Sequence, residues 1–175
     1  MGSRAYIACL ALAVAGCGGS TPAKTPAPKA PEQIQLTSTA FKSGGTIPTP
    51  YTCSGAGDPP PLRAVNVPRK AKSMALLVED PDAPGGTFVH WTTWDLSPRT
   101  LASSDHPSEG KNSSGRTGWT PPCPPNGDKP HHYVFALYAL SKPLGLQDGA
   151  SPDAVHHALR GNAIAMGRLI GRFGR

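Results

Sequence analysis

The chain has 175 residues, with 38% hydrophobic and 16% charged side chains, and it contains 20 glycines and 21 prolines. So many turn-forming residues argue against a helical bundle and favour one mainly β domain with long connections. The formal net charge of +6 comes without a dense run of Lys and Arg, so we expect no nucleic acid among the partners.

Residues 1–16 have the features of a signal peptide. One Arg precedes an apolar run, AYIACLALAVA, which has the length of a signal-peptide core and is too short to span a bilayer. The run leads into Val14-Ala15-Gly16-Cys17, which resembles a bacterial lipobox, so we predict that Cys17 is the lipidated N-terminal residue. An ordinary secretory signal is the alternative. Because two acyl chains give stable anchoring, we predict a membrane-anchored lipoprotein of the cell envelope, in the outer membrane if the host has one.

A tether is predicted after the lipidated cysteine. From Cys17 onward the sequence CGGSTPAKTPAPKAPE combines small residues, Lys and spaced Pro, without an apolar stripe that a fold would bury. We predict that residues 17–32 form this Pro/Ala/Gly-rich tether and that residues 33–175 form the domain.

Two of the four cysteines are available for a disulfide. Cys9 leaves with the signal peptide and Cys17 takes the lipid, so Cys53 and Cys123 remain as an even pair in an oxidising compartment. We predict that they form a disulfide, with two separate buried thiols as the alternative. A zinc site is not expected because the chain has no Cys-x-x-Cys motif, and we expect neither a metal nor a cofactor.

Strand patterns dominate the rest of the chain. Residues 73–79 are an apolar run, and residues 34–39, 87–96 and 132–140 alternate or are rich in β-forming residues. Clusters of Pro and Gly separate these segments. Ser151-Pro152-Asp153 is a typical helix start, and that helix is predicted to stop at Gly161. Residues 163–173 are compatible with a further helix or with a final strand.

Four polar side chains are placed so that they could meet in one cavity. Because side chains alternate across a strand, His90 is expected to share a face with Phe88, Thr92 and Trp94, and His131 with Tyr133. Asp80 follows directly on the apolar run. Imidazole and phenol groups donate hydrogen bonds to anions, and a carboxylate holds a histidine in one tautomer. Spacing alone does not establish such a site, because a histidine in a strand is more often a core or surface residue.

Two longer motifs resemble the signatures of a known family. The sequences DPDAPGGTFVHW (residues 80–91) and GRTGWTPPCPPNGDKPHHYVFALYAL (residues 115–140) resemble those of the phosphatidylethanolamine-binding protein family, in its bacterial Raf-kinase-inhibitor-like branch. Shorter similar segments, including residues 46–55, 140–150 and the ending LIGRFGR, follow in the expected order. The resemblance implies an antiparallel β-sandwich with one or two short peripheral or C-terminal helices. It also implies a pocket for phosphate, phosphoethanolamine head groups and similar anions.

The same resemblance assigns the candidate ligand-binding residues by position. They are an acidic pair, a strand histidine, two prolines of a pocket loop, and a His and Tyr of the later strand: Asp80, Asp82, His90, Pro121, Pro122, His131 and Tyr133. A cis peptide bond before Pro84 is also implied. Four positions depart from the family pattern, among them Asn162, which stands where a His is common, so that a polar contact is lost. His132 stands where an Arg is usual and removes a permanent charge. Trp119 replaces a Tyr and Pro121 replaces a Gly, which narrows the expected pocket.

The function favoured by these residues is that of an envelope-anchored binding protein for small phosphate-bearing anions or phospholipid head groups. An alternative is an inhibitor that interacts with a protease or a signalling partner through the long polar loop of residues 97–116. Hydrolysis is less favoured, because the chain has no Gly-x-Ser-x-Gly elbow, and we therefore expect no catalytic residues and no enzyme activity.

Overall fold

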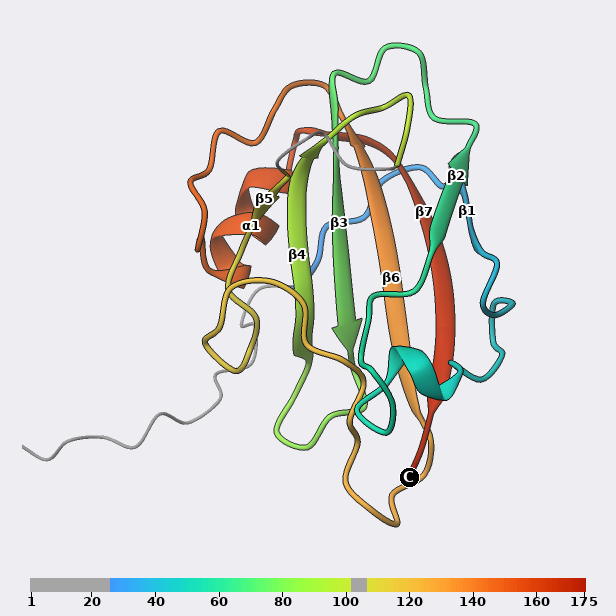
Figure 1. Cartoon of the computed structure of the whole chain (residues 1–175). Coiled ribbons are helices and arrows are strands. Elements are labelled where there is room, and N and C mark those ends of the chain that lie inside the picture. The colour runs from blue at the N-terminus through green and yellow to red at the C-terminus, as the bar shows by residue number, and fades with distance from the viewer. Residues whose placement is uncertain (1–25, 102–106) are drawn as a thin grey trace, which may run out of the picture.

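The computed structural model of the chain describes residues 26–101 and 107–175 (Figure 1). The predicted signal peptide and the predicted lipidation site, Cys17, lie outside the described residues. Among the described residues, no helix has both the length and the apolar character needed to cross a membrane.

Two antiparallel sheets form the fold (Figure 1). The larger sheet has the order β5-β4-β3-β6-β7 and the smaller one pairs β1 with β2. The strands of the larger sheet are β3 Ser73–Asp80, β4 Phe88–Leu96, β5 Ser108–Glu109, β6 His131–Leu140 and β7 Ala163–Phe173. The smaller sheet consists of β1 Gln35–Ser38 and β2 Leu62–Val65, and the helices are the 3-10 helix η1 Thr49–Tyr51 and α1 Pro152–Leu159. The predicted mainly β class with antiparallel sheets and one short α-helix is confirmed.

The larger sheet buries both of its faces. On β6, Tyr133, Phe135 and Leu137 point into a first core that the β1–β2 sheet covers. Tyr138 and Leu140, on the opposite face of the same strand, point into a second core that includes α1. A strand covered on both faces has apolar residues at successive positions, which explains the continuous apolar run in β3.

A β-bulge in β4 changes which side chains share a face. Val78 of β3 pairs with Trp91 and Glu79 pairs with Val89, so His90 lies opposite no residue of β3. In a bulge the two residues opposite one partner residue alter the alternation and re-aim a side chain.

This bulge corrects the predicted face of His90. The histidine ring contacts Phe88, with ring centroids 4.7 Å apart, as predicted. Beyond the bulge, however, Trp91 rather than Thr92 follows His90 on the first-core face, and Trp94 packs in the second core near α1. The predicted grouping of His90 with Thr92 and Trp94 is therefore wrong, because one extra residue reverses the alternation.

The last part of the predicted tether packs on the domain. Ala27 and Ala30 lie against the second core. The Tyr138 hydroxyl donates to the Pro28 carbonyl at 2.9 Å, and the Met166 amide donates to the Pro31 carbonyl at 2.9 Å. The packed structure thus begins before Gln33, because a Pro-rich segment still offers carbonyl oxygens to neighbouring donors.

Residues 163–173, for which a helix and a strand were both possible, form the long strand β7. Two glycines in β7 explain how other segments reach its backbone. A Cβ at Gly167 would overlap the Ile34 backbone, and a Cβ at Gly171 would overlap the Ile47 side chain.

The predicted helix start is also present, since the Ser151 side chain accepts a hydrogen bond from the Ala154 amide at 3.3 Å.

Candidate functional site

A cavity of about 270 Å³ lies at the end of the larger sheet where β3 ends and β4 and β6 begin. The chain's C-terminus lies at the same end (Figure 1). Five of the seven predicted ligand-binding residues line this cavity: Asp80, His90, Pro121, His131 and Tyr133. Segments far apart in the sequence therefore meet at one small hollow.

The turn after β3 positions Asp80. One carboxylate oxygen, Oδ1, accepts a hydrogen bond from the Asp82 amide at 2.9 Å, so the side chain stabilises the turn that follows it. The Gly86 amide then donates to the Ala83 carbonyl at 3.1 Å, and Gly85 has a φ of +88°. This is the geometry of a tight turn with Pro84 followed by a glycine of positive φ. No described peptide bond is cis, so the expected cis bond before Pro84 is wrong. Gly85 supplies the reversal instead.

Asp80 also holds His131. Its Oδ2 lies 2.7 Å from His131 Nδ1, and both side chains are buried. Because Asp80 Oδ2 serves as the acceptor, Nδ1 carries the hydrogen and the ring orientation is fixed. The other ring nitrogen, Nε2, lies 3.7 Å from Asp128 Oδ2, from the loop that precedes β6.

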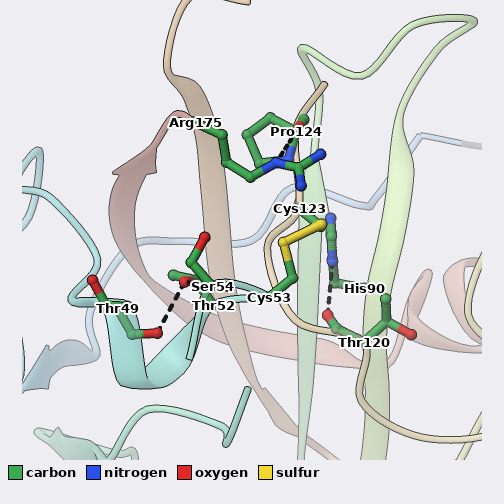
Figure 2. Close-up of a disulfide and its surroundings, with 9 residues drawn as sticks. All are labelled: Thr49, Thr52, Cys53, Ser54, His90, Thr120, Cys123, Pro124 and Arg175. Atoms are coloured by element: carbon green, nitrogen blue, oxygen red, sulfur yellow. Dashed lines mark hydrogen bonds between the residues drawn. A yellow bond between two sulfur atoms is a disulfide. The ribbon is translucent and has the colours of Figure 1, made fainter. Parts of the chain in front are cut away.

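His90 is fixed by the pocket loop, residues 119–125, which precedes β6 and lines the cavity. Its Nδ1 lies 2.8 Å from the Thr120 carbonyl oxygen, as Figure 2 shows. The ring also packs edge-on against Tyr133, with centroids 5.2 Å apart. Burial lowers the pKa of His90, and the hydrogen bond to Thr120 and the charge of Asp80 offset this only in part. His90 is therefore a neutral imidazole at physiological pH, with the hydrogen on Nδ1.

Tyr133 is the third polar group of the cavity. Its side chain is fully buried, and its hydroxyl has no hydrogen-bond partner among the described residues. Burial raises the pKa of Tyr133, and the negative charges of Asp80 and Asp82 raise it further. The phenol therefore keeps its proton and remains a donor at physiological pH.

The two other predicted site residues, Asp82 and Pro122, do not line the cavity. Asp82 Oδ2 accepts hydrogen bonds from the backbone amide and from Nδ1 of His132, each at 2.7 Å, on an exposed surface. The hydrogen bond from the His132 amide is the main cause that lowers the pKa of Asp82. The Pro122 carbonyl accepts from the Cys53 amide at 3.0 Å. Both residues thus support the cavity wall from outside.

The predicted disulfide is present and fixes the pocket loop. Cys53 and Cys123 are joined across 70 positions of sequence, and Cys123 lines the cavity. Figure 2 also shows the C-terminal Arg175, whose Nε donates to the Pro124 carbonyl at 2.8 Å. Two connections from distant parts of the chain therefore hold the loop that carries Thr120 and Pro121.

The substitutions at Trp119 and Pro121 leave the cavity open. Trp119 packs against Trp91 and Phe135, and its Nε1 donates to the Gly57 carbonyl at 2.7 Å. Its side chain therefore anchors the loop, and Pro121 forms part of the cavity wall.

Several residues of the site were not predicted from the sequence. Phe88 lines the cavity. Its position two residues before His90 could have predicted this, because residues two apart in a strand share a face. The Thr120 carbonyl gave no signal, because every residue carries such a group. Asn112 donates through Nδ2 to the Gly118 carbonyl at 3.0 Å and to Thr120 Oγ1 at 2.9 Å, so it braces this loop from a buried position.

The described residues contain no group of three His, Cys, Asp or Glu side chains that could hold a metal ion.

The sequence and the fold of the chain are similar to those of known proteins. The family model described as phosphatidylethanolamine-binding protein matches residues 37–174. A protein of Mycobacterium tuberculosis named "Putative lipoprotein LppC" is 38% identical over 185 aligned positions, which cover 94% of this chain and 91% of LppC. The crystal structure of a phosphatidylethanolamine-binding protein homolog from Chlamydia trachomatis is 39% identical with a TM-score of 0.76, covering 82% of this chain and 99% of that one. Escherichia coli YbcL, described as a new member of the mammalian family, is 31% identical with a TM-score of 0.72 and the same coverages.

Proposed function

Because the chain belongs to the phosphatidylethanolamine-binding protein family, we propose that it binds small phosphate-bearing anions or phospholipid head groups in the cavity at the end of β3, β4 and β6. The observation that carries this proposal is the buried Tyr133 hydroxyl, which has no partner among the described residues. A buried hydroxyl without a partner costs about 1–3 kcal/mol, and an anionic oxygen in the cavity would remove this cost.

The size of the cavity favours a small ligand. Drug-sized ligands occupy pockets of about 300–1,000 Å³, and this cavity of about 270 Å³ lies just below that range. It suits a phosphate or an ethanolamine phosphate.

Binding rather than turnover is part of the proposal. The cavity lining includes no serine, its cysteine is in a disulfide, and the Thr120 hydroxyl accepts a hydrogen bond from Asn112. A nucleophile would need an adjacent base, and neither histidine has a hydroxyl or thiol as a recorded partner among the described residues.

Envelope anchoring through Cys17 is the second part of the proposal. It is supported by the lipobox-like Val14-Ala15-Gly16-Cys17 and by the 38% identity to a relative named as a lipoprotein. Replacing Cys17 by Ala is expected to move the protein from the membrane to the soluble fraction. Mass spectrometry of the N-terminal peptide checks the lipid directly, and an unmodified Cys17 in the mature protein contradicts this part.

The interaction alternative has less support. Asn112 and Ser113 of the predicted interaction loop are buried, and Asn112 holds Thr120 at the cavity wall. This part of the loop therefore has a structural role in the site.

The test is calorimetric titration with O-phosphoethanolamine. Tyr133→Phe removes only the unpartnered hydroxyl and is expected to weaken binding about tenfold, the value of one hydrogen bond to a charged group. Tyr138→Phe is the matched control, because this tyrosine lies on the same strand but on the other face and bonds Pro28. No binding to the wild-type protein at millimolar ligand, or equal binding by wild type and Tyr133→Phe, contradicts the proposal.

A further inference from the structure

His90 presents a hydrogen-bond acceptor to the cavity. Its Nδ1 lies 2.8 Å from a carbonyl oxygen, which only accepts, so Nδ1 carries the hydrogen of the neutral ring. The other nitrogen, Nε2, then holds a lone pair. Figure 2 shows this second nitrogen at the end of the ring that points away from Thr120. The structure records no hydrogen bond from Nε2 to any described residue, while the ring itself lines the cavity.

The charged and titratable groups around His90 come from several elements. Asp80 lies at the end of β3, and its charge favours protonation of His90. His131 of β6 opposes protonation, and Tyr133 of the same strand is neutral. Asp128 lies near His131. The guanidinium group of Arg175 donates a hydrogen bond to the Pro124 carbonyl of the pocket loop. Burial is the largest of the influences on the His90 ring, and it favours the neutral form.

The cavity therefore has two different requirements for a ligand. The Tyr133 hydroxyl donates, so it matches an oxygen that carries negative charge. His90 Nε2 accepts, so it matches a hydroxyl group of the ligand. A phosphate monoester meets both requirements, because its second pKa is about 6 and its monoanion has one P–OH beside charged oxygens.

Anions without an ionisable hydroxyl do not meet the second requirement. A phosphodiester group and a sulfate ion present only acceptors at neutral pH, and an acceptor against the His90 lone pair is unfavourable unless the buried ring takes up a proton.

We infer that the cavity selects anions with an exchangeable proton, such as phosphate monoesters and inorganic phosphate, over the phosphodiester of an intact phospholipid and over sulfate. This inference rests on the proposed function and narrows its ligand class. When a phosphate dianion binds near pH 7.5, one proton from the solvent joins it and lies between the phosphate oxygen and His90 Nε2. No other bond forms or breaks.

Four probes test this inference with the full-length protein: inorganic phosphate, sulfate, O-phosphoethanolamine and dimethyl phosphate, a diester without hydroxyl groups. At pH 7.5 we expect the two ligands with an ionisable P–OH to bind at least about tenfold more tightly than sulfate and the diester. Titration in buffers of different ionisation enthalpy is expected to show uptake of about one proton per phosphate, and the affinity is expected to rise up to about tenfold for each unit that the pH falls from 8 towards 6.5.

Two variants separate the role of His90 from a general loss of binding. In His90→Gln, the side-chain amide can present either its oxygen or its NH₂, so the ratio of phosphate to sulfate affinity is expected to fall towards one. In Tyr133→Phe, both anions lose the same donor, so each binds more weakly while their ratio stays high.

The outcomes distinguish this inference from the proposed function. Equal affinities for phosphate, sulfate and the diester in the wild-type protein, or phosphate binding without proton uptake, overturn the inference and leave anion binding intact. Absence of binding for all four probes overturns both.

Discussion

Glu79 and Asp80 are adjacent in β3, and their carboxylates contact histidines on opposite faces of the sheet. Asp80 Oδ2 lies 2.7 Å from Nδ1 of His131 in β6, whereas Glu79 Oε1 lies 2.9 Å from Nε2 of His156 in α1. Successive side chains of a strand point to opposite faces, which accounts for this division. Only the Asp80 pair belongs to the cavity, and the Glu79 pair joins the helix to the sheet.

The two carboxylates give a matched pair of variants. Asp80→Asn replaces one of two accepting oxygens by an NH₂ group, which then faces either the Asp82 amide or the His131 Nδ1–H. We expect a loss of about 1–3 kcal/mol in the free energy of unfolding, together with weaker phosphoethanolamine binding. Glu79→Gln is expected to lower stability without changing the dissociation constant. Urea unfolding and calorimetry measure the two effects, and an equal change in binding for both variants contradicts the assignment.

The pH dependence of stability is expected to depend on His90. Because burial places its folded-state pKa below the usual value of 6.5, the unfolded chain binds more protons than the folded one just below that pH. The His90 contribution is therefore complete above about pH 6.5 and decreases as the pH falls below it. Urea unfolding between pH 5.5 and 8, without anions, should show a shallower decline for His90→Gln than for the wild-type protein. Equal slopes would show that His90 is not buried in its neutral form.

Removing the disulfide is expected to affect both stability and binding. In the chain-entropy model, a bond that closes a loop of 70 residues contributes about 4 kcal/mol. The double variant Cys53→Ala, Cys123→Ala should lose about this amount and bind phosphoethanolamine more weakly, because Cys123 is part of the cavity wall. A reducing agent should reproduce the loss in the wild-type protein and have no effect on the double variant. Unchanged binding after reduction would mean that Arg175 and Trp119 suffice to hold the loop.

The packed part of the N-terminal segment makes a further prediction. A chain that starts at Gln33 loses the contacts of Ala27 and Ala30 and the acceptors for Tyr138 and Met166. Compared with a chain that starts at Pro26, we expect it to be less stable by about 1–3 kcal/mol in urea unfolding, since two buried donors lose their partners. Equal stability of the two chains would show that residues 26–32 do not stabilise the domain and act only as a tether.

Much of the fold could be predicted because its signals are local. The apolar run of β3, the alternation in β6 and the capping residue Ser151 each act within a few residues. Simple alternation also predicted that His131 and Tyr133 share a face. The disulfide was predicted because Cys53 and Cys123 are the two cysteines outside the predicted signal peptide and lipidation site.

The features that could not be predicted depend on distant parts of the chain or on the backbone. The bulge at His90 appears only when β4 is paired with β3. The acceptor for His90 is a main-chain carbonyl at Thr120, and the packing of Ala27 and Ala30 depends on a surface that strands and helix form together. The peptide bond before Pro84 is trans and Gly85 has a positive φ, an alternative that the sequence of the turn leaves open.

The register on both sides of the bulge has a consequence for how such a site can arise. Val89 pairs with Glu79, and Trp91 pairs with Val78. A chain without residue 90 would therefore have a continuous ladder at this point, with the side chains of Val89 and Trp91 on the same faces of the sheet as in the present chain. His90 is thus the extra residue of the β-bulge and has no pairing partner in β3. A single-codon insertion at this point of β4 would therefore add the imidazole without changing how Val89 and Trp91 pair with β3.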